Sequence, residues 1–323
     1  MKVKWENVAI LAIGVIIIIA GLVFLISKLT SNNDEKPTEE KEKVVEKVKP
    51  VITYKDKVVM VHGEKVDLLE GVSAKDENGE VVYTTIEGEY DTNKIGVYKL
   101  KYVATDRNDL TTKEDFTLYV LQKLDSVSQK SDNIEFFTTS KGFEGAVING
   151  ITYIDGILVA NKTYALPESY NPGELNTIAY AKAKEMLDDS KKEDLNIWIQ
   201  SGFRSYETQE SIYNRYVRKD GQDKADTYSA RPGHSEHQSG LAFDVNEIDY
   251  TFDDTPEANW LSDNCYKYGY ILRYPKGKTD ETGYVYESWH FRYVGEELAK
   301  KLYNNGQWIT VEDYFGITSK YSD

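Results

Sequence analysis

Histidines and carboxylates gather in two short segments of this chain. Residues 231–244 read Arg-Pro-Gly-His-Ser-Glu-His-Gln-Ser-Gly-Leu-Ala-Phe-Asp, and residues 287–290 read Glu-Ser-Trp-His. The chain has four histidines, and three of them lie in these two segments. Imidazoles and carboxylates are common ligands of a catalytic zinc ion. This concentration therefore indicates a metal site.

His237, Asp244 and His290 are the expected zinc ligands, because a catalytic zinc takes three protein ligands and leaves one position for water. His237 and Asp244 are seven residues apart, and on one regular strand that odd spacing puts side chains on opposite faces. A turn at Gly240 would let the two converge. Residues 289–294 alternate as a strand, which would carry His290 to the same ion.

Glu287 is the expected general base. It precedes His290 by three residues, from where its carboxylate reaches the attacking water without binding the metal. A carboxylate in that position can accept a proton from the water. Two imidazoles and one carboxylate leave a zinc complex with a charge of about +1, which polarises a peptide carbonyl. His234, in the Arg231-Pro-Gly turn, has no carboxylate at matching spacing and is predicted to be structural.

Other peptidase classes fit less well. No serine is followed by lysine three positions later, as serine D,D-peptidases require, and the zincin motif His-Glu-x-x-His is absent from the sequence. A cysteine peptidase or L,D-transpeptidase would need Cys265 as its nucleophile. Leu261, Cys265 and Tyr268 share one helical face, which predicts a packed thiol instead.

Composition limits the partners of the chain. Its 323 residues predict about two domains, and its net charge of −15 argues against nucleic acid as a partner. The single cysteine excludes an internal disulfide. The oligomeric state is left open.

The N-terminal segment predicts a membrane anchor. Residues 8–27 carry no charge and are long enough to cross a bilayer as a helix. A cleaved signal peptide is the alternative, although no small-x-small cleavage site follows. Lys2 and Lys4 precede the span, which predicts a cytoplasmic N-terminus and a catalytic domain outside a Gram-positive-like cell, facing the wall. We therefore expect a single-pass anchor in residues 1–29 and a charged linker in 30–50.

Residues 51–124 are predicted to form an all-β sandwich. Short β-branched and aromatic runs alternate with turns rich in Asn, Asp and Gly, which is typical of a small antiparallel sandwich. Segments 69–76, 89–98 and 102–106 resemble bacterial immunoglobulin-like modules of cell-surface proteins. The resemblance implies a stalk.

Residues 125–323 are predicted to form an α+β domain with an antiparallel sheet. A helical pattern starts after Pro172, and a buried strand over 196–200 precedes a helix that begins near Glu207. Arg204 and Gln209 flank this strand-to-helix junction, a frequent place for site residues. For Arg204, a surface salt bridge explains the sequence equally well.

Two motifs in this third region resemble the VanY-type zinc D,D-carboxypeptidases. They are Ser235-x-His237-x-x-Gly240-x-Ala242-x-Asp244 and Glu287-x-Trp289-His290. The resemblance covers roughly residues 145–316 and implies one Zn²⁺, held by His237, Asp244 and His290, with Glu287 as the catalytic residue. It further implies that Arg204 faces the developing oxyanion, and that Ser235 and Gln209 hold the substrate.

The resemblance implies release of the C-terminal D-alanine from peptidoglycan stem peptides. L,D-carboxypeptidase activity on tetrapeptides and endopeptidase cleavage of cross-links share the same motifs, so these alternatives stay open. A wall-binding module that has lost turnover is the non-enzyme alternative. The complete set of ligands and base argues against it, since binding needs no general base.

Overall fold

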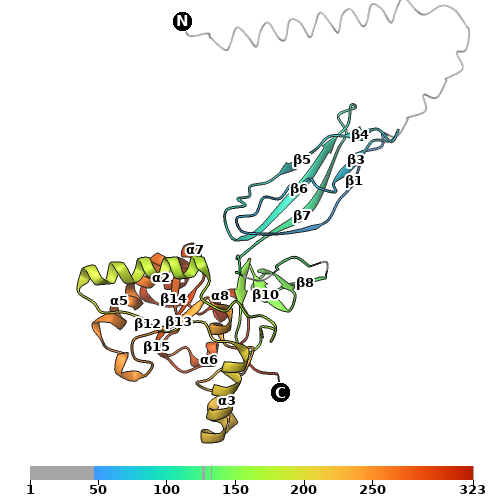
Figure 1. Cartoon of the computed structure of the whole chain (residues 1–323). Helices are drawn as coiled ribbons and strands as arrows, with labels where there is room; N and C mark the ends of the chain where they lie inside the picture. Colours follow the sequence, from blue (N-terminus) through green and yellow to red (C-terminus); the bar gives the residue numbers. More distant parts are fainter. Residues whose placement is uncertain (1–46, 126–127, 132, 323) are drawn as a thin grey trace, which may run out of the picture. The chain divides into compact units, whose positions relative to one another are not determined.

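The computed structural model describes residues 47–125, 128–131 and 133–322. Within these ranges the strands form four sheets (Figure 1). Two separate hydrophobic cores support them, one drawn from residues 52–120 and the other from residues 119–315.

The first core lies between two sheets with strand orders β1-β3-β4 and β2-β7-β6-β5. Their strands are β1 (Val51–Thr53), β2 (Lys57–Val61), β3 (Ser73–Lys75), β4 (Val81–Val82), β5 (Thr84–Glu87), β6 (Gly96–Thr105) and β7 (Thr111–Leu121). On β6, buried Leu100, Tyr102 and Ala104 alternate with exposed Lys99 and Lys101. This period of two seats one face of the strand on the core.

One pair departs from the predicted antiparallel sandwich, because β2 and β7 run parallel. Between β2 and β5 the chain passes through the antiparallel pair β3 and β4 of the other sheet. When the chain returns to the sheet of β2, strand β5 runs in the same direction as β2. The prediction of a wholly antiparallel sandwich is wrong at this edge.

A third sheet, of order β11-β10-β9-β8, is antiparallel throughout. Its strands are β8 (Ile134–Thr138), β9 (Glu144–Ile148), β10 (Ile151–Ile154) and β11 (Ile157–Val159). Every residue of β10 and β11 is buried, which explains why their sequence is apolar except for Thr152. The Leu158 carbonyl on β11 accepts a hydrogen bond from Arg292, and this bond ties the third sheet to the fourth.

The fourth sheet, of order β12-β13-β15-β14, is antiparallel and carries the candidate site. Its strands are β12 (Ile199–Ser201), β13 (Ala242–Val245), β14 (Tyr270–Tyr274) and β15 (Glu287–Tyr293). Phe243 and Phe291 are fully buried and face the core, whereas their neighbours Asp244 and His290 face the other side.

In Figure 1, helix α2 (Thr177–Ser190) runs along one side of this sheet, and helix α3 (Tyr206–Asp220) extends away from the sheet on the other side. Helix α2 begins later than the predicted start after Pro172, because the Asn176 side chain accepts hydrogen bonds from the first-turn amides. Its Ala179 carbonyl accepts a hydrogen bond from the Tyr270 hydroxyl at 2.6 Å, which fixes α2 to β14. The remaining helices are α4 (Gln222–Ala225), α5 (Pro256–Asn264), α6 (Thr279–Thr282), α7 (Glu296–Tyr303) and α8 (Val311–Phe315).

The predicted fold class needs a correction, because it included an N-terminal transmembrane helix. Among the described residues, the structure contains no helix with the length and apolarity needed to cross a bilayer. The longest, α3, has 15 residues and a largely polar sequence, whereas a span needs about 20 apolar residues. Residues 8–27, on which the prediction fell, lie outside the described ranges. The fold class that the described residues support is β sheets followed by an α+β region.

Candidate active site

The structure brings His237, Asp244 and His290 together on the fourth sheet. Asp244 and His290 are direct partners across β13 and β15, so their side chains project from the same face. The Asp244 carboxylate lies between the two rings, with Oδ2 3.2 Å from His237 Nε2 and Oδ1 3.1 Å from His290 Nδ1. One ligand atom from each residue falls within 4.8 Å of the others. All three side chains are buried.

Gly240 makes this convergence compatible with the spacing of seven residues. His237 lies in a 3-10 turn, Glu236–Ser239, which ends at Gly240 with a φ of +70°. A side chain there would be strained, and its Cβ would lie 2.7 Å from the Glu174 carbonyl oxygen. The chain then enters β13, so His237 approaches Asp244 from the turn and not from the strand.

The donor set fits a divalent cation. His237 Nδ1 lies 2.7 Å from the Gly202 carbonyl, which accepts only from an N–H, so the Nε2 lone pair faces Asp244. A lone pair and a carboxylate oxygen 3.2 Å apart repel each other unless a proton or a cation lies between them. Two imidazoles and one carboxylate are a common ligand set of catalytic zinc. His237, Asp244 and His290 are therefore suited to hold such an ion.

Glu287 lies next to this group, with Oε2 3.7 Å from His290 Nδ1. On β14, Leu272 pairs with Phe291 and Tyr274 pairs with Glu287. Two residues of β14 therefore span the same length as four residues of β15, which is a β-bulge in β15. Such a bulge re-aims a side chain, here Glu287, whose odd spacing from His290 would otherwise point it away. Burial raises the pKa of Glu287 to about 8, and the nearby Asp244 carboxylate adds to the effect.

The pKa values of the three proposed ligands shift in different directions, because their neighbours differ. Burial opposes charge on His290, but the neighbouring Asp244 and Glu236 carboxylates outweigh burial and raise its pKa to about 9. Burial lowers the pKa of His237, with Asp244 acting in the opposite direction. Burial also opposes charge on Asp244, yet the two histidines hold its pKa well below the usual range. Asp244 is therefore a permanent anion.

Arg204 points toward the same carboxylate and does not form the surface salt bridge that was the alternative. Its Nη2 lies 3.8 Å from Asp244 Oδ2 and donates to Ser201 Oγ, while its Nη1 donates to Gln209 Oε1 at 2.8 Å. Gln209 also donates to the Ala230 carbonyl at 2.6 Å, which fixes the amide orientation. Gln209 thus orients Arg204, and the substrate contact expected of Gln209 stays a prediction.

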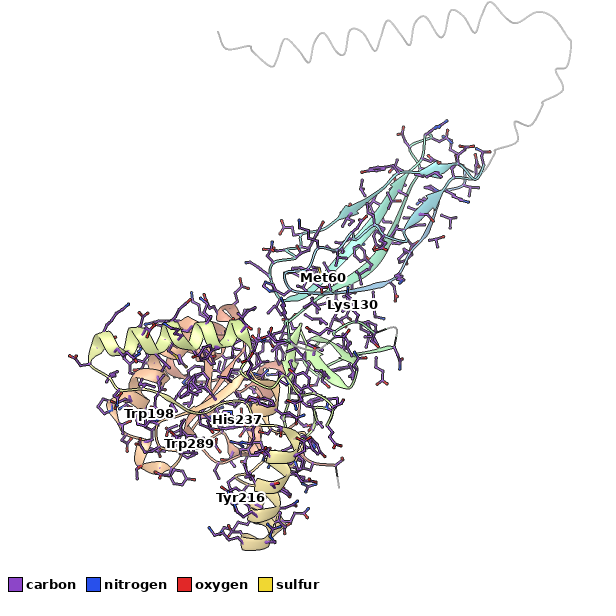
Figure 2. All side chains as sticks on the ribbon, viewed as in Figure 1. Met60, Lys130, Trp198, Tyr216, His237 and Trp289 are labelled. Atoms are coloured by element: carbon purple, nitrogen blue, oxygen red, sulfur yellow. The ribbon has the colours of Figure 1, made fainter. Side chains whose placement is uncertain are left out.

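A cavity of about 520 Å³ opens onto these residues. All seven residues predicted as metal ligands, base, oxyanion contact or substrate contacts line it, and Ser235 is buried in its wall. Tyr216, Tyr250 and Trp289 add an apolar lining. Figure 2 labels Trp289 on the site sheet, His237 close to that sheet and Tyr216 on α3. The cavity has the size of a site for a short peptide.

Two other sequence predictions are confirmed. His234 lies outside the metal-ligand group: its Nδ1 is 2.8 Å from the Asn161 carbonyl, and its ring packs edge-on against Tyr321. Cys265 is fully buried, and burial raises the pKa of its thiol far above the ordinary value. A buried neutral thiol does not act as a nucleophile.

Three buried charged residues next to the site were not predicted. Glu236 accepts from Arg273 Nε at 2.8 Å and from Arg292 Nη1 at 3.0 Å. The available signal was one arginine in the otherwise hydrophobic segment Tyr270–Tyr274 and another two residues after His290 in Glu287–Tyr293. A buried arginine requires a carboxylate partner, but which carboxylate it meets depends on the fold.

Comparison with known proteins agrees with this geometry. Residues 173–296 match the family model VanY, D-alanyl-D-alanine carboxypeptidase. YodJ of Bacillus subtilis, assigned as a carboxypeptidase, is 37% identical over 230 residues, which cover 61% of this chain and 82% of YodJ. A D-alanyl-D-alanine carboxypeptidase of Enterococcus faecalis is 35% identical over 140 residues, 41% of this chain and 52% of that protein.

Among solved structures, the L,D-carboxypeptidase DacB from Streptococcus pneumoniae is 41% identical. The match covers 58% of this chain and 99% of DacB, with a TM-score of 0.46. From the sequence matches, the chain belongs to the VanY family of carboxypeptidases. It is therefore a hydrolase of the D-alanyl-D-alanine carboxypeptidase type.

Proposed function

We propose that this chain is a zinc-dependent carboxypeptidase that removes the C-terminal D-alanine from peptidoglycan stem peptides, with the D,D bond of pentapeptides as its main target. One observation carries the proposal: the ligand atoms of His237, Asp244 and His290 converge beside the Glu287 carboxylate at the wall of a peptide-sized cavity. The names of the family model and of the Enterococcus faecalis relative support the choice of the D,D bond.

Zinc, when bound by these three residues, would lower the pKa of water and polarise the scissile carbonyl. The Glu287 carboxylate accepts the proton of the attacking water and delivers it to the leaving amine. Its raised pKa suits this exchange, because a base with a pKa near the working pH both accepts and releases a proton. A nearby cation would draw that pKa down from about 8 toward neutrality.

Arg204 supplies the fixed positive charge. Its guanidinium is held by Gln209 and Ser201 on one side, which leaves the side toward Asp244 and the cavity for a substrate oxygen. A pre-oriented cation lowers the energy of the tetrahedral oxyanion at no cost in reorganisation during the reaction. Ser235, in the cavity wall, is placed to contact the peptide.

Peptidoglycan stems lie outside the cytoplasmic membrane, so we place the working enzyme on the extracellular, wall-facing side. The net charge of −15 suits an enzyme that is soluble at that surface and has no nucleic-acid partner.

The test is release of D-alanine from defined stem peptides, followed by mass spectrometry. Purified chain is incubated with pentapeptide and tetrapeptide muropeptides, before and after chelation and after zinc is restored. Zinc-restored release from the pentapeptide is the expected result. Release from the tetrapeptide alone would move the activity to the L,D bond, and cleavage inside a cross-link would make it an endopeptidase. A peptide that binds and is never cut would refute the proposal in favour of a binding module.

A further inference from the structure

We infer that Glu236 is a positioning residue that fixes the ring nitrogen with which His290 binds a metal ion. The inference rests on the proposed metal site and extends it to a residue behind the ligands. Glu236 immediately precedes His237 in the chain, but its carboxylate faces His290 from the side opposite to Asp244.

The observation that carries the inference is a pair of facing polar atoms. Glu236 Oε2 and His290 Nε2 are both buried, and among the described residues neither forms a hydrogen bond. They lie 3.5 Å apart. A buried donor and a buried acceptor that face each other form a hydrogen bond with a small adjustment, and leaving both unsatisfied costs free energy. The Nε2 proton of His290 therefore belongs to this contact.

That placement decides the chemistry at the other ring nitrogen. If Nε2 carries the proton, Nδ1 of the neutral ring has a free lone pair, and Nδ1 is the atom 3.1 Å from Asp244 Oδ1. His237 is arranged in the reverse way, because the Gly202 carbonyl takes its Nδ1 proton and leaves Nε2 for the metal. The two rings thus offer different nitrogens, and each choice is made by an acceptor behind the ring.

The orientation of Glu236 is fixed by two arginines that both donate to Oε1. Arg273 Nε and Arg292 Nη1 lie 2.8 and 3.0 Å from that oxygen, which leaves Oε2 free for His290. Arg273 also forms a bidentate pair with Glu312. Two arginines and two glutamates balance in charge, so the interior holds an ionised carboxylate without a net charge. Burial opposes the charge of Glu236, but the arginines outweigh burial and hold its pKa well below the usual range.

The substitution Glu236→Gln tests the inference sharply. The glutamine carbonyl would accept from the two arginines, and its NH₂ would then face His290 Nε2 as a donor. The ring would have to accept at Nε2 and carry its proton on Nδ1, which blocks the metal-binding lone pair. We expect zinc affinity to fall by about 10- to 100-fold, the usual effect of losing a partner behind a ligand. Competition against a chromogenic chelator measures this affinity.

Glu312→Gln is the matched control. It removes one negative charge from the same buried cluster and weakens the ion pair of Glu312 with Arg273. Among the described residues, no hydrogen bond or ion pair joins Glu312 to His290. Its zinc affinity should stay close to that of the unaltered chain. An equal loss in both variants would overturn the inference, because the effect would then come from the cluster charge and not from the proton on His290.

A measurement on the unaltered chain keeps the inference testable if Glu236→Gln does not fold. In zinc-loaded protein with ¹⁵N-labelled histidine, long-range ¹H–¹⁵N correlation should show His290 protonated at Nε2 and metal-bound at Nδ1. The opposite assignment would overturn the inference. Failure of the unaltered chain to bind zinc would refute the proposed function instead, so the two failures are distinguishable.

Discussion

Asp244 and His290 stand directly opposite each other on the antiparallel strands β13 and β15, with Oδ1 and Nδ1 3.1 Å apart. A rigid sheet therefore sets the distance between two of the three proposed ligands, and His237 joins them from a glycine-ended turn. A site on strands is more precisely held than one on loops.

Replacement of Glu287 by glutamine should remove catalysis and leave the metal. The amide keeps the shape of the side chain but cannot accept the water proton, so kcat should fall by about 10²- to 10⁴-fold. D-alanine release and zinc content, measured on the same sample, check this. Glu296→Gln, at an exposed carboxylate on α7, should behave as the unaltered chain. Full activity in Glu287→Gln would show that another group is the base.

Zinc affinity should rise with pH. The pKa of His290 is raised to about 9 in the metal-free protein, so below pH 9 a proton occupies the ring that the metal needs. Each proton displaced weakens binding as pH falls, by about tenfold per pH unit for a single site. Asp244 stays ionised throughout and adds no pH dependence. Chelator competition between pH 6 and pH 9 measures the slope, and a flat profile would contradict the raised pKa.

Replacement of Arg204 by lysine should lower kcat and spare zinc binding. Lysine keeps the charge but loses the fork that Gln209 and Ser201 orient, and loss of one oxyanion contact typically costs about 10²- to 10³-fold. Arg218→Lys, on the exposed face of α3, is the control. If Arg204→Lys were fully active, Arg204 would serve Asp244 as a simple ion-pair partner.

The buried charge cluster should dominate the stability of the α+β region. Arg273→Met leaves Glu236 and Glu312 short of a counter-ion inside the protein, and such losses cost about 3–5 kcal/mol. Lys141→Met breaks a half-exposed pair with Asp313, which is worth about 0–1 kcal/mol. Denaturant unfolding of both variants compares the free energies. Equal stability would mean that water reaches the cluster.

Cys265 should be chemically inert. Its thiol is fully buried and its pKa is raised by burial, so Ellman's reagent should react with the unfolded chain and not with the native one. Cys265→Ala should keep D-alanine release. Loss of activity on alkylation of native protein at Cys265 would revive the cysteine-peptidase alternative.

Residue types and local spacing were enough to predict the core of the site. The motif residues His237, Asp244 and His290 lie in two short segments, and the need for a turn at Gly240 follows from strand periodicity. The odd spacing of seven residues could not work on one strand, so the glycine was informative. The predictions that failed concerned strand direction in the sandwich, the start of α2 and the transmembrane part of the fold class. The anchor itself falls on residues outside the described ranges.

Tertiary structure alone decided which buried charges meet. Glu236 is adjacent to His237 in sequence, yet its partners Arg273 and Arg292 are 37 and 56 residues away. Gln209 was singled out by the sequence, but its contact with Arg204 appears only when the strand-to-helix junction folds. Periodicity tells which face of an element a side chain occupies. Which other element that side chain contacts depends on tertiary packing. Buried charges are stable only where packing places a counter-ion beside them.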